Sequence, residues 1–230
     1  MAHARGRLTL LACVATGIGL ALPVRQARAA ELTQNDLNTF LSAVQSGNAD
    51  VVAATLQSFP ELARLKARNG LTMLHLAVGK GSTPMVESLI SAGADPNAVG
   101  VHGATALHLA AGGGMADMVA VLLAHKADVA ARDEAGATPL HAAARAGDLK
   151  VYELLINAKA SVNATDASGA TPLFYAVKAN RYVIAEKLIA GGADVNIKTK
   201  DGRTALDDAV TFNRTEIAQM LRDKGATAGT

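Results

Sequence analysis

The chain has 230 residues, of which 50% are hydrophobic, 18% are charged and only 3% are aromatic. This apolar content argues against a largely disordered chain, and the length allows one or two domains. Because there is no Trp, the core must be aliphatic and rich in alanine, which favours close packing of helices. A single cysteine, Cys13, excludes a disulfide within the chain and any zinc or iron–sulfur site built on several cysteines.

Residues 1–29 have the order of features found in a targeting segment. Two arginines precede an uncharged stretch at 8–22, and Ala-Arg-Ala at 27–29 is a small-x-small motif of the kind signal peptidases accept. The segment resembles a bacterial secretory signal peptide. We therefore expect cleavage after Ala29 or Ala30 and a periplasmic protein.

Two other fates of this segment stay open. The uncharged stretch is near the lower limit for crossing a bilayer, so it could be retained as a membrane anchor. Leu-Leu-Ala-Cys at 10–13 resembles a lipobox, which would place a lipid on Cys13, although few apolar residues precede that cysteine. No arginine pair is present, which favours the general secretion route over the twin-arginine route.

The net charge depends on this segment. The whole chain carries 22 basic and 20 acidic residues, a formal charge of +2. Removing residues 1–29 takes away four arginines and no acid, which leaves 18 basic and 20 acidic residues. We therefore expect no nucleic-acid partner, since such proteins need a concentrated basic face. No second long apolar stretch follows, so we expect no stable membrane insertion after cleavage.

Most of the remaining chain repeats at one fixed interval. The interval from Gly70 to Gly103 is 103 − 70 = 33 residues. Five classes of residue recur at this interval, and such self-similarity is the signature of a repeat architecture. The recurring positions are Gly70, Gly103, Gly136, Gly169 and Gly202; Thr72, Thr105, Thr138, Thr171 and Thr204; Leu74, Leu107, Leu140, Leu173 and Leu206; Ala77, Ala110, Ala143, Ala176 and Ala209; and Ala94, Ala127, Ala160, Ala193 and Ala226.

The repeated motif resembles that of the ankyrin-repeat family. It reads Gly-Leu-Thr-Met-Leu-His-Leu-Ala from residue 70, Gly-Ala-Thr-Ala-Leu-His-Leu-Ala from 103 and Gly-Ala-Thr-Pro-Leu-His-Ala-Ala from 136. The resemblance covers 34–226 and implies an all-α repeat solenoid, an ankyrin-repeat stack with a helix-turn-helix and a β-hairpin loop in each unit. We expect one domain over 30–230 with about six repeats, four of them well matched and the outer two acting as caps.

Each recurring residue type has a physical role in such a unit. The glycine suits a turn with positive φ, and the threonine two residues later can cap the first helix. Gly81, Gly114 and Gly147 are expected to end that helix, with Asn180 and Asn213 in the same place later. The leucines, Leu140 and Leu173 among them, are expected in the core.

Three histidines at equal spacing, His75, His108 and His141, raise the question of a metal site. The resemblance implies a structural role instead, in which each histidine hydrogen-bonds backbone of the adjoining loop. Stacked repeats also hold these side chains too far apart for one ion to bridge. We expect no metal and no cofactor.

Signatures of catalysis are missing. The run Gly112-Gly113-Gly114 has no following Lys-Ser or Lys-Thr, so it indicates a helix end rather than a phosphate-binding loop. No serine lies in a Gly-x-Ser-x-Gly setting. Asp207 and Asp208 are adjacent on a helix, where side chains point to different faces. We expect a protein that is not an enzyme.

Function is therefore expected on the surface of the array, with another protein as partner and the chain itself a monomer. In the family that the chain resembles, partners occupy the concave face formed by hairpin tips and first helices. Two features stand out there: an apolar tip at 99–101 and a basic series toward the C-terminal half. The tip positions also include Arg68 and Asn69. The expected partner-binding residues are Val101, His102, Glu134, Arg145, Ser168, Lys178, Lys198, Lys200 and Arg203.

Three interpretations of the pathway stay open. The architecture and the signal peptide resemble those of small bacterial periplasmic ankyrin proteins linked to catalase or haem handling in oxidative defence. An immunity or inhibitor protein that neutralises a toxic enzyme in the periplasm is a second interpretation. A secreted effector acting on a host protein is a third, and it would require export beyond the periplasm.

Overall fold

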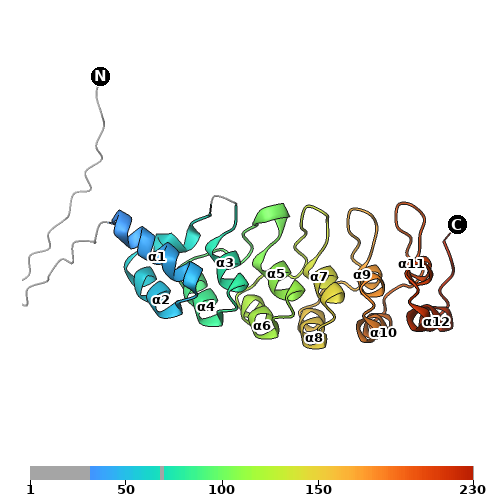
Figure 1. Ribbon diagram of the computed structural model, residues 1–230. Helices are drawn as coiled ribbons and strands as arrows, with labels where there is room; N and C mark the ends of the chain where they lie inside the picture. Colours follow the sequence, from blue (N-terminus) through green and yellow to red (C-terminus); the bar gives the residue numbers. More distant parts are fainter. Residues whose placement is uncertain (1–31, 68–69, 230) are drawn as a thin grey trace, which may run out of the picture. The chain divides into compact units, whose positions relative to one another are not determined.

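The computed structural model describes residues 32–67 and 70–229. Within these residues the chain is a stack of helix pairs joined by long loops on one side (Figure 1). The signal peptide expected at 1–29, like Arg68 and Asn69, lies outside the described residues. No helix in the described part is long and apolar enough to cross a membrane.

Each pair consists of an inner helix, next to the loops, and an outer helix. The inner helices are α1 (Gln34–Ser46), α3 (Met73–Gly79), α5 (Ala106–Gly112), α7 (Pro139–Ala146), α9 (Pro172–Lys178) and α11 (Ala205–Thr211). The outer helices are α2 (Ala49–Ser58), α4 (Thr83–Ser91), α6 (Ala116–Ala124), α8 (Leu149–Asn157), α10 (Tyr182–Ala190) and α12 (Thr215–Asp223). Two short 3-10 helices complete the described elements, η1 (Pro60–Arg64) and η2 (Val101–Gly103). The expected all-helical repeat stack is confirmed.

The recurring threonines begin the inner helices, as the sequence predicts. Thr72, for example, has extended backbone angles, and its hydroxyl accepts a hydrogen bond from the backbone N–H of His75. Proline occupies the first turn of α7 and α9, where a missing N–H costs nothing. The left-handed residues that follow the inner helices include Gly147 at φ 88° and Asn213 at φ 54°. Both ends of these helices are therefore encoded locally.

We call the loops that lead into the inner helices fingers, with tips at 99–104, 132–137, 165–170 and 198–203. The described residues contain no strand; strand-like pairing is limited to two isolated antiparallel bridges, 66 with 72 and 99 with 105. The expected hairpins are thus tight turns, closed for example by the N–H of Asp133 donating to the carbonyl of Ala137 at 3.0 Å. Neighbouring fingers touch closely, because a Cβ on Gly136 would lie 2.8 Å from the backbone nitrogen of Ala167.

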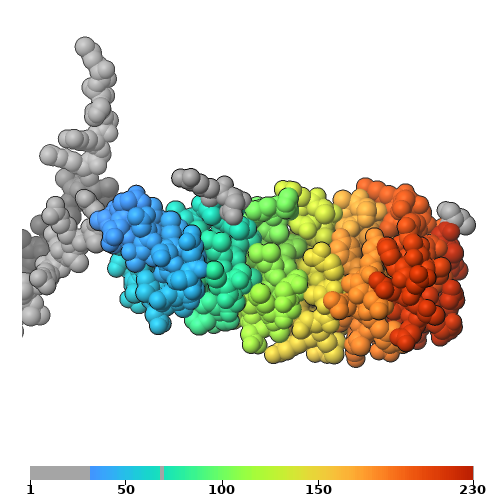
Figure 2. All heavy atoms as spheres, in the orientation of Figure 1, coloured from blue at the N-terminus to red at the C-terminus, as the bar shows by residue number. Residues whose placement is uncertain are grey.

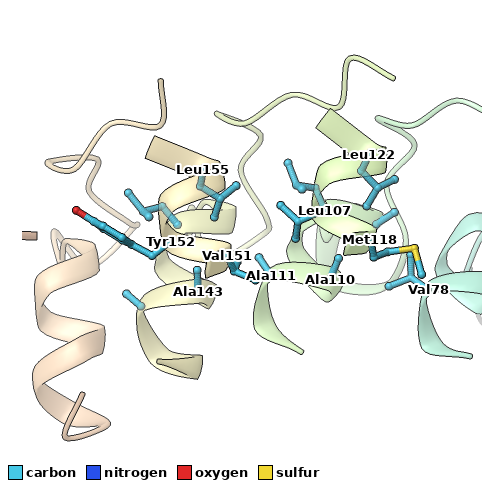
Figure 3. Packing of buried hydrophobic residues seen from close by; sticks show 14 of the residues in the cluster. Val78, Leu107, Ala110, Ala111, Met118, Leu122, Ala143, Val151, Tyr152 and Leu155 are labelled. Atoms are coloured by element: carbon cyan, nitrogen blue, oxygen red, sulfur yellow. The ribbon is translucent and has the colours of Figure 1, made fainter. Parts of the chain in front are cut away.

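The core runs along the whole stack between inner and outer helices. Leu140 and Leu173 are fully buried, as expected. Small residues such as Ala110 and Ala143 let successive inner helices approach closely, and α5 packs against α7 as α7 packs against α9. Figure 3 shows these alanines beside the larger aliphatic side chains of the outer helices. Because segments follow one another in sequence order along the stack (Figure 2), each repeat contacts mainly its neighbours.

A second series of contacts joins the repeats at the far ends of the outer helices. In three repeats an asparagine side chain donates to a backbone carbonyl of the next repeat: Asn97 to Lys126, Asn163 to Gly192 and Asn196 to Gly225. Arg64 makes the equivalent bond to the carbonyl of Gly93. The alanine at 130 occupies the same position between Asn97 and Asn163 and has no side chain that could make the bond.

The residues that follow α12 pack against the last repeat. The N–H of Thr227 donates to Asn196 at 2.9 Å, and the N–H of Gly229 donates to the Asp207 carboxylate at 2.7 Å. These contacts place the tail where the finger of a further repeat would lie. At the opposite end, α1, α2 and η1 form the helical unit expected at 34–66, and its role as a cap stays a prediction.

Candidate functional site

The three recurring histidines join each inner helix to the finger of the next repeat. The Nε2 atoms of His75, His108 and His141 lie 2.8, 3.0 and 3.1 Å from the carbonyl oxygens of Ala104, Ala137 and Ala170. Because a carbonyl can only accept, Nε2 carries the hydrogen. Each Nδ1 lies 2.7 to 2.9 Å from the hydroxyl of the capping threonine, which donates to it. We call this Thr–His–carbonyl arrangement the histidine link.

The histidine links confirm a structural role for these residues. Burial lowers the pKa of all three imidazoles, although the hydrogen bond to the carbonyl acts in the opposite direction. The rings are therefore neutral near pH 7, and both nitrogens of each ring already have partners. Among the described residues no three His, Cys, Asp or Glu side chains are grouped in a way that could hold a metal ion.

Phe174 and Asp207 replace the histidine in the last two repeats. Phe174 is buried in α9 and has no polar atom to offer the following finger. Asp207 accepts from the backbone and hydroxyl of Thr204 and from Gly229, so it caps α11 and holds the tail. Burial raises the pKa of Asp207, but these hydrogen bonds outweigh it and lower the pKa below its usual value.

The fingers and the exposed side of the inner helices form one continuous surface, the finger face. All nine expected partner-binding residues lie on it. Toward its N-terminal half, Val101 and His102 are exposed in the finger with its tip at 99–104, and Glu134 is exposed in the next finger. The Nδ1 atom of His102 lies 3.5 Å from the Glu134 carboxylate, an exposed contact that contributes little stability.

The C-terminal half of the finger face contains two adjoining hollows of about 390 Å³ each, which together we call the basic notch. They share three lining residues, Ser168, Ala170 and Lys178. The first hollow is also lined by Arg145, Asp166, Phe174, Tyr175 and Ala179, and the second by Thr199, Lys200, Asp201, Arg203 and Asp208. The structure thus brings together five of the nine expected residues: Arg145, Ser168, Lys178, Lys200 and Arg203.

Asp166 forms one wall of the first hollow, and its carboxylate is already hydrogen-bonded. One oxygen accepts from the N–H and hydroxyl of Ser168 and from the N–H of Ala170, at 2.7 to 2.9 Å. The other accepts from the hydroxyl of Tyr175 at 2.8 Å. Burial and this bond raise the pKa of Tyr175, which therefore remains a neutral donor. The Tyr175 ring also packs edge-on against His141, with ring centres 5.0 Å apart.

Asp208 lies beneath the second hollow with only 4% of its side chain exposed. It forms a close ion pair with the guanidinium of Arg203 and a longer one, 3.6 Å, with the ammonium of Lys178. The Arg203 guanidinium also donates to the hydroxyl of Thr211. A buried carboxylate therefore holds two cations at the boundary between α9 and α11.

This pairing corrects one expectation about the basic series. Arg145, Lys178 and Arg203 were expected to act together as a basic series on the binding surface, but Arg203 is half-buried against Asp208. Lys198 is exposed and lines neither hollow. A larger hollow of about 570 Å³ lies toward the N-terminal end of the stack and is lined by Arg64, Lys66 and Asp95 among others.

Sequence reasoning missed Asp166, Tyr175 and Asp208. Asp207 and Asp208 do point to different faces, as expected, but the groups that those faces meet were not predicted. A signal was available for Asp208, because the equivalent residues in earlier repeats, such as Leu109 and Ala142, carry no charge. Tyr175 occupies the same repeat position and is likewise a polar departure, but the sequence does not identify Asp166 as its partner.

The sequence matches one protein-family model. The model for ankyrin repeats in three copies matches overlapping segments at 40–133, 98–166, 131–199 and 160–230. No curated protein matches the chain. Because the family matches span nearly the whole array, and because the helix pairs, fingers and histidine links follow one repeating plan, the chain belongs to the ankyrin-repeat family.

Proposed function

We propose that this protein is a non-catalytic module that binds another protein through the finger face. Ankyrin repeats serve generally in protein–protein interaction. The observation that supports this use of the finger face is its mixture of exposed apolar and charged side chains. Val99, Val101 and Leu109 are 49%, 38% and 40% exposed, and the basic notch follows them along the stack. Such mixed surfaces are typical of protein interfaces.

The binding face can be tested by charge reversal with a matched control. The finger-face variant carries Arg145→Glu, Lys198→Glu and Lys200→Glu, three exposed positions for which no ion pair occurs among the described residues. The control carries Lys150→Glu, Lys159→Glu and Lys187→Glu, exposed residues in or next to the outer helices. Both variants change the net charge equally. Arg203 and Lys178 stay unchanged because reversal beside Asp208 would disturb folding.

The readout is crosslinking of the purified protein to partners in a periplasmic extract, with identification by mass spectrometry. Loss of the crosslinked partner in the finger-face variant alone supports the proposal. Loss in the control alone would move the interface to the outer helices, and a variant with Val99→Ser and Val101→Ser tests the apolar half separately. No loss in any finger-face variant contradicts the proposal.

We further propose that the protein is exported to the periplasm and acts there in oxidative defence with a catalase or a haem-handling protein. The support is the targeting segment at 1–29 and the resemblance to small periplasmic ankyrin proteins. The intact mass of exported protein should correspond to a chain that starts at Ala30 or Glu31. A mass that includes residue 1, or a lipid on Cys13, would contradict the export route. A secreted toxic enzyme as the crosslinked partner would favour an immunity role instead.

A further inference from the structure

The basic notch lies where two neighbouring inner helices expose a cation at the same repeat position. Arg145 in α7 and Lys178 in α9 are equivalent residues of adjacent repeats and line the same hollow. The equivalent position is Gly79 in α3, Gly112 in α5 and Thr211 in α11. The charge is therefore a local feature of two repeats and is not part of the recurring pattern.

The carboxylates in the walls leave part of this positive charge without a close partner. Asp166 already accepts four hydrogen bonds, and Asp208 is held closely by Arg203. Lys178 lies 3.6 Å from Asp208, too far for a strong hydrogen bond. For Arg145 and Lys200 no carboxylate lies within ion-pair distance among the described residues. An additional carboxylate could thus bind without displacing an internal one.

We propose that the basic notch binds an acidic segment of the partner protein in the polyproline II conformation, in which two carboxylates three residues apart enter the two hollows. The first carboxylate pairs with Arg145 and Lys178, and the second pairs with Lys200. Packed helices lie about 8–10 Å apart. A polyproline II chain advances about 3.1 Å per residue with about three residues per turn, so side chains three positions apart point to the same side. Acidic residues three positions apart therefore match the spacing of neighbouring repeats. This inference rests on the proposed function and specifies the chemistry of the partner.

The rest of the notch favours short apolar residues between the two acids. Ala179 lines the first hollow, and the nearly buried Ala170 and Phe174 lie at its floor. A dense polyanion such as a nucleic acid fits poorly, because Asp166, Asp201 and Asp208 also line the notch and reduce its net charge to a single positive unit. The notch therefore suits two separate carboxylates better than a continuous phosphate backbone.

The probe is a fluorescein-labelled dodecapeptide with Glu-Ala-Leu-Glu at its centre and a Gly-Ser background. The first comparison peptide has Gln-Ala-Leu-Gln at the centre. A second carries its two glutamates six positions apart. Binding is measured by fluorescence anisotropy at low ionic strength and again in about 0.3 M salt, where exposed charge interactions are screened.

The notch variant is Arg145→Ala with Lys178→Ala, and the matched control is Lys150→Ala with Lys187→Ala. We expect the glutamate peptide to bind the unmodified protein at least about tenfold more tightly than either comparison peptide. The notch variant should lose about tenfold in affinity, whereas the control should change by less than about twofold. Circular dichroism and melting temperature confirm that each variant is folded.

Three results would overturn the inference: equal affinity for the glutamate and glutamine peptides, equal loss in notch variant and control, or no binding of the glutamate peptide up to about 1 mM. These results are distinct from failure of the proposed function. A natural partner that still crosslinks to the notch variant but not to the Val99→Ser and Val101→Ser variant would preserve binding through the finger face while contradicting the acidic segment.

Discussion

Different contacts hold two neighbouring boundaries of the stack, the one between α7 and α9 and the one between α9 and α11. At the first, His141 donates to the carbonyl of Ala170 and closes the following finger onto the inner helix. At the second, Phe174 occupies the histidine position and offers no donor to the equivalent carbonyl, that of Arg203, which accepts from the backbone N–H of Thr199 in its own finger. The last finger therefore lacks the hydrogen bond that the histidine provides at the first boundary.

Ion pairs provide part of the connection at the second boundary. Asp208 of α11 pairs with Lys178 of α9 and with Arg203 of the last finger. A neutral histidine link satisfies its polar atoms internally and presents nothing to solvent, whereas the charged connection leaves cations at the surface beside a hollow. A departure from the repeat consensus can thus hold two repeats together and also place cations beside a hollow at the surface.

The largest expected effect comes from removing apolar contacts that both boundaries share. Leu140→Ala should lower the free energy of unfolding by about 2–5 kcal/mol, because it leaves a cavity in a fully buried site. Leu173→Ala should cost a similar amount if hydrophobic packing is equal at the two boundaries. Chemical denaturation measures both, and a loss below about 0.5 kcal/mol at either site would contradict the repeat register.

The substitution Asp208→Asn removes the ion pairs at the boundary between α9 and α11. The substitution keeps the side-chain shape but leaves Lys178 and Arg203 without their common carboxylate. We expect a loss of about 1–3 kcal/mol in denaturation, less than for a fully buried ion pair because both cations are partly exposed. Asp201→Asn, at an exposed acid in the same finger, is the control. An equally small effect of both variants would show that the buried ion pair contributes nothing.

The histidine-linked boundaries should respond to mild acid. Burial lowers the pKa of His75, His108 and His141 in the folded state, while unfolded histidine titrates at about 6.5. The unfolded chain therefore binds protons more readily, and the free energy of unfolding should fall as pH drops below about 6.5 until the folded imidazoles are protonated. The lowered pKa values of Asp166 and Asp207 place their contributions at more acidic pH.

His141→Phe, which copies the residue found at 174, isolates one histidine link. The fall in melting temperature between pH 7 and pH 5 should shrink by roughly a third if the three links contribute equally. The exposed His125 provides the control, since His125→Phe removes a histidine without touching a link. The same pH response in the unmodified protein and the His141→Phe variant would contradict the assignment.

The smallest expected effect is a gain in stability at the outer side of the stack. Ala130→Asn would place an asparagine where Asn97 and Asn163 each bridge to the following repeat. In each such bridge the amide also accepts a hydrogen bond from a backbone N–H of the following repeat. Because the bridge is exposed, we expect it to raise the free energy of unfolding by about 0.5–1.5 kcal/mol. Ala130→Leu, which has neither donor nor acceptor, is the control in denaturation experiments. A gain with leucine equal to that with asparagine would mean that the bridge is not the cause.

Much of the fold was predictable because the same capping, turn and core residues recur in every repeat. The capping threonines, the left-handed residues at 147, 180 and 213, and the buried leucines all lie where the period predicts. These features depend on backbone geometry and burial within one unit, and the period repeats both. The site was less predictable: position on the finger face followed from the repeat pattern, but the grouping of Arg145 with Lys178 in one hollow, and of Arg203 with Asp208, did not.

The repeat, its helix boundaries and the surface on which charged residues lie follow from the amino-acid pattern of one unit, and the structural use of three histidines follows from the family resemblance. The availability of each charge depends on how the repeats stack. Lys178 and Arg203 look alike in the sequence, yet one is exposed and loosely paired while the other is half-buried in a close ion pair. The physical reason is that charge pairing depends on distances between side chains of stacked repeats. A period describes what the repeats have in common, whereas the basic notch arises where neighbouring repeats differ.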